Sequence, residues 1–214
     1  MKLELRPEHK TIGLLFSGGM DSSLLLYMLG RQYPNRRIMA FSAGCDYIDN
    51  RVHMPFAHQV FDKVTTLVPT GALDYHITHY HSDRTTHHCN QAMTEFGGMV
   101  DVWVNGLNKA PPPGTIVSNC FGEEKDLYEY CHLEDRKHDI PQWHNINEYE
   151  YYTPFAKLDK QEIVSLYKRF GIFSQLIPLT RSCPKCWEYD EMKQFTPECG
   201  WCYFCLERKW GLMK

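Results

Sequence analysis

The chain has 214 residues, of which 43% are hydrophobic and 23% are charged, and 26 acidic against 23 basic side chains give a formal net charge of −3. This composition excludes a disordered or collagen-like chain and predicts one domain, or one domain with a small appendage. The slight acidic excess argues against a dedicated nucleic-acid or membrane binder, so we expect neither as a stable partner. Charged residues interrupt the apolar pairs at the N-terminus, and the densest apolar stretch, 24–29, is too short to span a bilayer. We therefore expect a cytoplasmic protein.

The first hundred residues alternate between predicted strands and predicted helices. An apolar run at 10–16 ends at Ser17-Gly18-Gly19 and is followed by the apolar stretch 24–29, which predicts a buried strand, a glycine turn and a buried helix. Further strands are expected at 38–42, 75–80 and 100–104, and a further helix at 57–67. This alternation is typical of an α/β fold, in which a parallel sheet carries helices on both faces.

The second half carries one clear helix. Asp159 is placed to cap it, Glu162 stands at its third helical position, and Gly171 is expected to end it. Between 105 and 152 the pattern weakens, and we expect loops, with a helix near 126–133 as the one candidate element. The predicted organisation is an α/β domain at 1–176 and a cysteine-rich segment at 177–214 packed on it.

The loop from Ser17 to Ser23 reads SGGMDSS and lies between the first strand and the first helix. Glycines in such a turn leave backbone N–H groups at a helix N-terminus, an arrangement that binds phosphate. The loop has neither the GK[ST] ending of a Walker A motif nor the GxGxxG spacing, which disfavours γ-phosphoryl transfer and NAD binding. A plain turn of small residues is the alternative. The coincidence of two glycines, a carboxylate and three hydroxyls after a buried strand favours a ligand site.

The segment Ser17 to Ser22 resembles the SGGxDS motif of the PP-loop ATP pyrophosphatases. That resemblance implies a Rossmann-like fold of the adenine nucleotide α-hydrolase type, whose loop holds the pyrophosphate of ATP with Mg²⁺ while a substrate oxygen attacks the α-phosphorus. The implied catalytic residues are Ser17, Asp21 and Ser22. The serine hydroxyls would stabilise the negative charge of the departing pyrophosphate, and the Asp21 carboxylate would help to place the metal. The implied nucleotide-binding residues are Phe16, Ser17, Gly18, Gly19, Met20, Asp21, Ser22, Ser23, Phe41 and Lys160.

Five of the nine cysteines fall in the last 32 residues. Residues 199–205 form a CxxCxxC run, and Cys183 lies 16 residues upstream, so four thiolates can meet at one tetrahedral ion. We favour a structural zinc site that orders the segment. An iron–sulfur cluster and a Cys183–Cys186 redox pair are alternatives, and Cys186 is either a free neighbour or a replacement for Cys183 as a ligand.

The C-terminal half resembles the 7-cyano-7-deazaguanine synthase (QueC) family. The similarity rests on Thr153-Pro154-Phe155, on 158–164, on Gly171-Ile172, on Thr180-Arg181-Ser182-Cys183, and on the CGxCxxCxxR pattern from Cys199 to Arg208. With the N-terminal loop it covers about half of the chain, while 47–152 matches poorly and the segments 41–45 and 104–108 depart from the family pattern.

The resemblance implies Zn²⁺ held by Cys183, Cys199, Cys202 and Cys205. It also implies an ATP-dependent ligase of queuosine biosynthesis that adenylates the carboxylate of 7-carboxy-7-deazaguanine and uses ammonia to form the amide and then the nitrile, with release of AMP and pyrophosphate. Free ammonia is the expected nitrogen donor because the chain offers no N-terminal cysteine of a glutaminase. The family often forms homodimers. The departures leave the substrate open.

Three other functions remain as alternatives. A PP-loop RNA-thiolating enzyme would use a reactive cysteine such as Cys45 or Cys120, an amide-forming variant would act on a different carboxylate, and an inactive scaffold would present a zinc ribbon to a partner. The histidines between His76 and His88 are expected to line a pocket or face solvent rather than to bind a metal. The three tyrosines at 149, 151 and 152 are expected to pack or to line the rim of a site rather than to catalyse. Lys160 is ordinarily a solvated charge, although the resemblance gives it a role at the phosphates.

Overall fold

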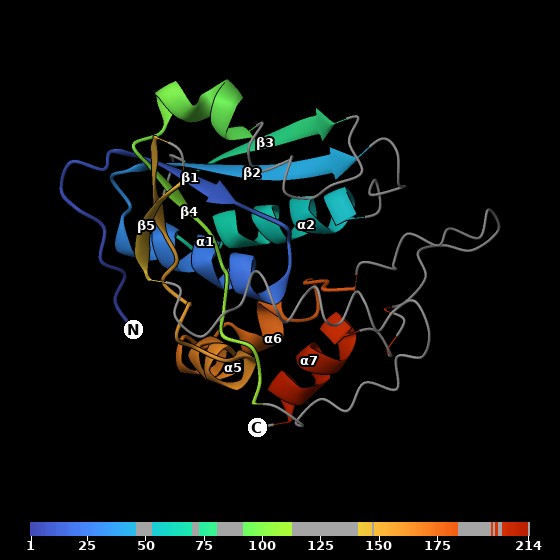
Figure 1. Cartoon of the computed structure of the whole chain (residues 1–214). Coiled ribbons are helices and arrows are strands. Elements are labelled where there is room, and N and C mark those ends of the chain that lie inside the picture. The colour runs from blue at the N-terminus through green and yellow to red at the C-terminus, as the bar shows by residue number, and fades with distance from the viewer. Residues whose placement is uncertain are drawn as a thin grey trace.

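The centre of the molecule is a six-stranded sheet with the order β3-β2-β1-β4-β6-β5 (Figure 1). The computed structural model describes residues 1–45, 53–69, 73–80, 92–112, 141–146, 148–183, 198, 200 and 203–213. Among the strands of these residues, four neighbouring pairs are parallel, and the pair of β5 and β6 is antiparallel. The predicted α/β fold with a mostly parallel sheet is therefore confirmed. The strands are β1 (Thr11–Leu15), β2 (Arg37–Cys45), β3 (Leu73–Tyr80), β4 (Val102–Val104), β5 (Trp143–Ile146) and β6 (Tyr149–Tyr152).

In the described part of the chain, helices lie on both faces of the sheet, with more of them on one face than on the other. One face carries α1 (Met20–Gln32) and α2 (His53–Thr65), and beyond α1 lies a layer of α5 (Lys160–Arg169), α6 (Phe173–Leu176) and α7 (Tyr203–Leu212) (Figure 1). The other face carries the short helical stretch 92–96 and the 3-10 turn η2 (Gly97–Met99). None of the helices in the described part of the chain is long and apolar enough to cross a membrane.

Two hydrophobic clusters, one on each face, hold these layers together. The larger cluster packs Ile12 and Leu14 of β1 against α1, α2 and α5. The smaller one lies on the opposite face and joins Phe41 to Trp103 and Tyr151. Because β1 is buried from both sides, its sequence is an apolar run without alternation, which is the pattern that predicted a central parallel strand.

The helix predicted after Asp159 is confirmed in detail. The Asp159 side chain accepts a hydrogen bond from the Glu162 N–H at 2.9 Å, and the Glu162 carboxylate accepts one from the Asp159 N–H at 2.9 Å, which together form a capping box. Gly171 follows the helix with φ of 70°, the left-handed conformation that ends helices. Local capping chemistry therefore places the first residue of α5, Lys160.

The expectation of loops up to residue 152 is wrong for its last part, where β5 and β6 form a hairpin. The strands have only four residues each, too short for a clear polar–apolar alternation. Both faces of β6 are used: Tyr152 stacks on Trp143 with ring centroids 4.4 Å apart, and the Tyr151 hydroxyl donates to the Met93 sulfur. The predicted packing of these tyrosines is confirmed, whereas the candidate helix at 126–133 lies outside the described residues.

The strand order creates a switch point beside β1. The chain passes from β1 to β2 and β3 on one side and then crosses to β4 on the other side. In parallel sheets, ligands bind at the carboxyl ends of two strands whose connections leave in opposite directions. The carboxyl ends of β1 and β4 are therefore the place to look for a site.

Candidate active site

The SGGMDSS loop connects the carboxyl end of β1 to the N-terminus of α1. Ser17 and Ser22 close it: their hydroxyl oxygens are 3.1 Å apart, and the Ser17 N–H donates to the Ser22 hydroxyl at 3.3 Å. Gly19 is the N-cap of α1 and has no side chain to accept from the first helical N–H groups. The start of α1 thus presents backbone donors and the positive end of the helix dipole at the end of β1.

Two close approaches make this loop tight. Gly18 has φ of 71°, and a Cβ on it would lie 2.7 Å from the Ala57 Cα of α2. On another side, the Arg181 N–H donates to the Gly18 carbonyl at 3.3 Å. The loop is therefore held between α2 and the segment that precedes Cys183, and no residue other than glycine fits at position 18.

The segment after β4 touches the same loop. A Cβ on Gly106 would lie 2.9 Å from both the Asp21 carbonyl carbon and the Ser22 nitrogen. The Asn105 side chain accepts from the Leu107 N–H at 3.0 Å and folds this turn against the loop. Asn108, 2% exposed, follows with neither amide atom hydrogen-bonded. Gly106 thus lets the two strand ends of the switch point meet.

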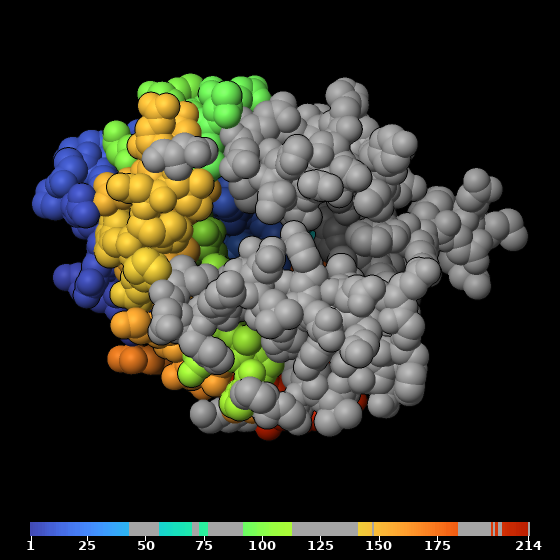
Figure 2. All heavy atoms as spheres, in the orientation of Figure 1, coloured from blue at the N-terminus to red at the C-terminus, as the bar shows by residue number. Residues whose placement is uncertain are grey.

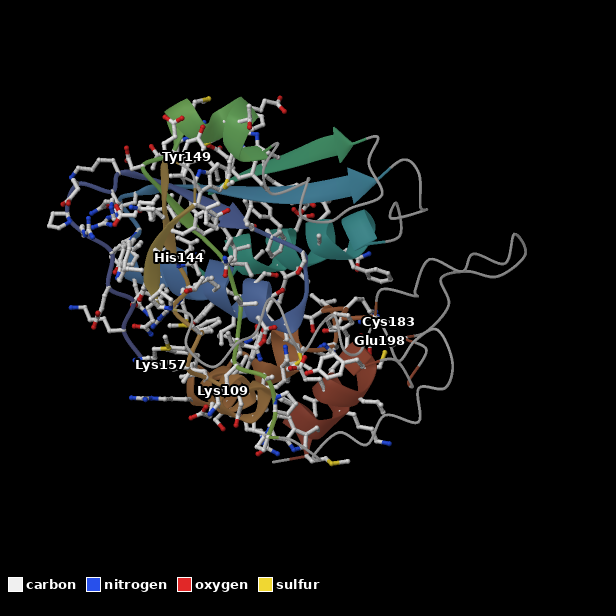
Figure 3. All side chains as sticks on the ribbon, in the orientation of Figure 1. Lys109, His144, Tyr149, Lys157, Cys183 and Glu198 are labelled. Atoms are coloured by element: carbon white, nitrogen blue, oxygen red, sulfur yellow. The ribbon has the colours of Figure 1, made fainter. Side chains whose placement is uncertain are left out.

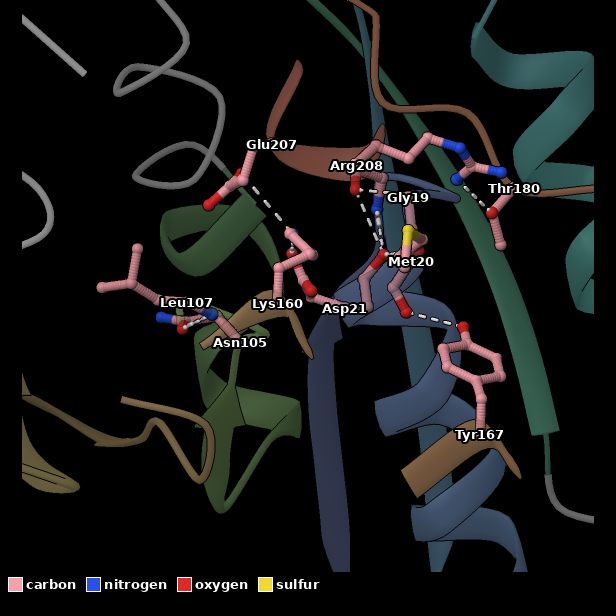
Figure 4. A network of polar contacts seen from close by, with 12 residues as sticks. Gly19, Met20, Asp21, Asn105, Leu107, Lys160, Tyr167, Thr180, Glu207 and Arg208 are labelled. Carbon is pink, nitrogen blue, oxygen red and sulfur yellow. Dashed lines mark hydrogen bonds and ion pairs between the residues drawn. The ribbon is translucent and has the colours of Figure 1, made fainter. Parts of the chain in front are cut away.

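A buried lysine bridges the loop to the C-terminal helix (Figure 4). The Lys160 ammonium donates to the Asp21 carboxylate at 2.5 Å and lies 3.7 Å from the Glu207 carboxylate of α7. The Lys160 side chain is only 4% exposed and that of Glu207 only 1%. The ordinary reading of Lys160 as a solvated charge is therefore wrong, because the residue that the capping box places first in α5 is turned toward the loop.

Asp21 retains one unused oxygen. Its Oδ2 accepts from Lys160, while its Oδ1 is buried and has no hydrogen-bond partner. A buried carboxylate oxygen without a partner commonly marks the place of an ion or water, and Mg²⁺ prefers carboxylate oxygen. The residues at the loop therefore fit the magnesium ion that the resemblance implies.

Tyr167 of α5 holds the first turn of α1 in place through a hydrogen bond. Its hydroxyl donates to the Met20 carbonyl at 2.6 Å, and its side chain is fully buried. Burial, and then the nearby Asp21 charge, raise the pKa of Tyr167 well above 10. The hydroxyl stays protonated at neutral pH and serves as a permanent donor that ties α5 to the loop.

Phe16 and Phe41 lie beside the loop as packing residues. The Phe16 N–H donates to the Phe41 carbonyl at 2.8 Å, and the two rings point to opposite faces of the sheet. The Phe41 ring is 3% exposed and packs against His76, Phe96 and Trp103 with centroids 5.0 to 5.1 Å apart. Nucleotide contact by either residue stays a prediction. Of the histidine group, His76 is thus a packing residue, whereas the side chain of His79 and the whole of His81, His87 and His88 lie outside the described part of the chain.

The C-terminal segment is anchored under the loop by Arg208. Its guanidinium, 8% exposed as a residue, donates to the Thr180 hydroxyl at 2.7 Å and to the Ile177 carbonyl at 2.8 Å, and pairs with Glu198 at 3.4 Å. Glu198 also accepts from the Ser182 N–H, so it lies close to Cys183 (Figure 3). Burial lowers the pKa of Arg208, and the Glu198 charge opposes that shift. These contacts hold 177–183 against the loop.

The four predicted zinc ligands are only half described. Cys183 and Cys205 are buried, while Cys199 and Cys202 lie outside the described residues. Within the described ranges, no group of three or more His, Cys, Asp or Glu side chains is placed to hold a metal ion. The four-cysteine zinc site therefore stays a prediction, as does the domain boundary after 176.

The sequence did not predict a role at the site for Gly106, Tyr167, Glu207 or Arg181. The signal for Gly106 was its place directly after the strand at the switch point. Arg181 contacts the loop through its backbone N–H, which carries no residue-specific signal, while its guanidinium donates to the Pro178 and Thr180 carbonyls. Figure 2 shows atoms of the N-terminal part of the chain (blue) near the middle of this side of the molecule.

Comparison with known families finds a match in the N-terminal part of the chain. Residues 8–73, which include the loop, α1 and β2, match the family model described as asparagine synthase. None of the curated proteins compared with the chain matches it.

Similar solved structures are distant in sequence. The U34-tRNA thiolase NcsA from Methanococcus maripaludis, a structure with its [4Fe-4S] cluster, is 12% identical, with 95% of this chain and 63% of that one covered at a TM-score of 0.47. The NH3-dependent NAD synthetase from Campylobacter jejuni, in complex with the nitrate ion, is 14% identical, with coverages of 81% and 69% and a TM-score of 0.45. The NMN synthetase from Francisella tularensis is 10% identical, with coverages of 82% and 66% and a TM-score of 0.43.

The chain thus spans less than two thirds of the length of the thiolase. The match over 8–73, with the SGGMDS loop inside it, confirms the predicted class for this part of the chain. Over these residues the chain is similar to the PP-loop, or adenine nucleotide α-hydrolase, domain of ATP-dependent ligases that form carbon–nitrogen bonds.

Proposed function

We propose that the protein is an ATP-dependent ligase of the 7-cyano-7-deazaguanine synthase kind, which adenylates the carboxylate of 7-carboxy-7-deazaguanine and replaces the activated oxygen by ammonia. The observation that carries the proposal is the meeting of two distant motifs. The loop motif contributes Asp21 and the C-terminal motif contributes Lys160, and these side chains are in direct contact at the switch point.

The first chemical step is attack of a carboxylate oxygen on the α-phosphorus of ATP. The bond from that phosphorus to the bridging oxygen breaks, and pyrophosphate leaves with both electrons. The N–H groups at the start of α1 and the Ser17 and Ser22 hydroxyls lie where they would receive the charge of the leaving group. Mg²⁺, held at Asp21, would supply further positive charge to the phosphates.

The second step uses the activated carbonyl. Ammonia adds to the carbon, AMP leaves with the former carboxylate oxygen, and one proton is released, which gives the amide. A second ATP activates the amide oxygen in the same way, and loss of AMP and of the amide protons gives the nitrile. The loop serves both rounds because each has the same leaving group, pyrophosphate.

The test supplies the acid, ATP labelled at the α-phosphate, Mg²⁺ and ammonium to the purified chain. Labelled AMP together with a product whose mass is that of the nitrile supports the proposal, and a product heavier by one water identifies the amide-forming variant. AMP formed only with tRNA would instead identify an RNA-thiolating enzyme. ADP and orthophosphate as the sole nucleotide products would refute the adenylating mechanism, and no AMP with any substrate would point to an inactive scaffold.

Zinc is the second part of the proposal. Four thiolates at Cys183, Cys199, Cys202 and Cys205 fit Zn²⁺, which binds such sets tetrahedrally in structural sites. The metal would order the segment that leads into α7, where Cys205 lies in the helix that carries Glu207 and Arg208. A structural metal here would act on the helix and not on the chemistry.

A further inference from the structure

Lys160 lies in a small enclosure formed by α7. The ammonium lies 3.7 Å from the carboxylate of Glu207, which follows Cys205 by two residues in α7 and is 1% exposed. Gly211 follows Glu207 by four residues, so the two lie on the same face of α7. Glu207 pairs with the ammonium of Lys160, and Gly211 lies against the Cβ and Cγ of the same side chain.

Gly211 is required there for space. A Cβ on it would lie 2.5 Å from the Lys160 Cγ, 3.1 Å from its Cβ and 3.2 Å from its carbonyl oxygen. These atoms lie at the base of the side chain and in the backbone, so a rotation of the ammonium end relieves nothing. An alanine would have to displace α7 from α5 or push the lysine away from the loop.

The charges around Lys160 explain why a second carboxylate is useful. In the free protein the ammonium is shared between Asp21 at 2.5 Å and Glu207 at 3.7 Å. Asp21 also faces the loop with an unpartnered oxygen suited to Mg²⁺. A metal ion held by that oxygen would compete with the ammonium for the Asp21 charge, and Glu207 would then remain as a partner of the ammonium.

We propose that Glu207 and Gly211 form a cradle, the α7 cradle, that positions Lys160 for contact with the phosphates of the nucleotide. Glu207 is a positioning residue that acts through Lys160 and does not itself touch the nucleotide. The inference rests on the proposed function, because the lysine needs a phosphate ligand to act on. It makes the C-terminal helix part of the nucleotide site, independently of any metal bound to the cysteines.

The test measures binding of α,β-methylene-ATP, an analogue that cannot be cleaved at the α-phosphate, in the presence of Mg²⁺ by titration calorimetry. E207Q and G211A should each weaken binding about tenfold, the usual scale for a misplaced charged contact. Simple electrostatics predicts the opposite sign for E207Q, because removing a nearby negative charge favours an anionic ligand. Unchanged or tighter binding by E207Q would therefore overturn the proposal.

Two matched controls make the same chemical changes elsewhere. E95Q removes an exposed carboxylate, and G98A adds a methyl where no atom lies within 4 Å. Both controls should bind like the wild type. Melting temperatures are measured for all four variants, and if E207Q does not fold, G211A still decides the question through its effect on binding.

A double-mutant cycle separates positioning from general support of the fold. Adding E207Q to K160M should weaken binding no further, because the group that Glu207 positions is gone. Additive losses would show that Glu207 does not act through Lys160, and would overturn the inference while leaving the proposed function intact. Failure of the wild type to bind the analogue would overturn the proposed function itself.

Discussion

Replacing Gly106 by alanine tests whether the switch point is assembled as the structure indicates. The added Cβ would lie 2.9 Å from the Asp21 carbonyl carbon, 2.9 Å from the Ser22 nitrogen and 3.0 Å from the Asp21 Cβ. Each contact is about 0.5 Å short of the 3.4 Å at which ordinary van der Waals contact begins. Two of the three atoms are backbone, so the turn after β4 and the loop have to move apart.

Overpacking of this kind costs about 2 kcal/mol, within a usual range of roughly 1 to 3 kcal/mol. For a chain of this length each kcal/mol lowers the melting temperature by about 2 to 4 °C, so we expect a fall of about 4 to 8 °C. A displacement of half an ångström at the loop should also lower turnover about tenfold, since 1 Å can cost about a hundredfold.

The assay is thermal unfolding followed by circular dichroism, together with the rate of pyrophosphate release. G98A again serves as the control, since its methyl meets no neighbour. If G106A melts within 1 °C of G98A and turns over at the same rate, the close contact between the turn and the loop does not exist, and the site described above is wrong.

Four further changes test other parts of the structure. R208M removes a buried guanidinium that contacts Thr180, Ile177 and Glu198, and it should lower the free energy of unfolding by about 3 kcal/mol, or the melting temperature by roughly 6 to 12 °C. A similar fall in melting temperature on replacing the exposed Arg169 would contradict this. Burial raises the pKa of Tyr167, so the stability that its protonated hydroxyl contributes is complete below pH 10 and is lost as the pH rises toward the folded-state pKa. Above pH 10 the melting temperature of Y167F should therefore fall less steeply with pH than that of the wild type. An identical slope would refute this. N108L should melt at the same or a higher temperature, because neither amide atom makes a hydrogen bond, and a fall of more than about 2 °C would reveal a partner. Elemental analysis should find about one zinc per chain, lost in C199S; iron with sulfide in its place would identify a cluster instead.

The parts of the fold that could be predicted are those whose cause is local. The apolar run before Ser17 predicts a strand buried on both faces, and the side chains of Asp159 and Glu162 can satisfy only the start of a helix. The hairpin of β5 and β6 could not be predicted in this way, because Trp143 and Tyr152 are half-polar aromatics whose burial depends on each other.

The site divides along the same line. The loop motif carries its own backbone geometry, so Gly18 and Ser22 could be placed from the sequence. The burial of Lys160 and the role of Glu207 could not, since each depends on a helix that comes from a distant part of the chain. From the sequence alone, a charged residue that is buried cannot be distinguished from one that faces solvent, because its burial depends on a partner elsewhere in the chain.

The contacts that complete the loop have consequences for folding. Asp21 meets Lys160 across 139 positions, and the Tyr167 hydroxyl reaches Met20 across 147. Closing a chain loop of this length costs entropy, and a chain in which only the N-terminal half is folded lacks both contacts. A ligand that binds only when the loop has these contacts stabilises the native state alone, by about 2.7 kcal/mol when its concentration is a hundred times Kd. Resistance to proteolysis should accordingly rise with nucleotide only in molecules whose last helix has docked.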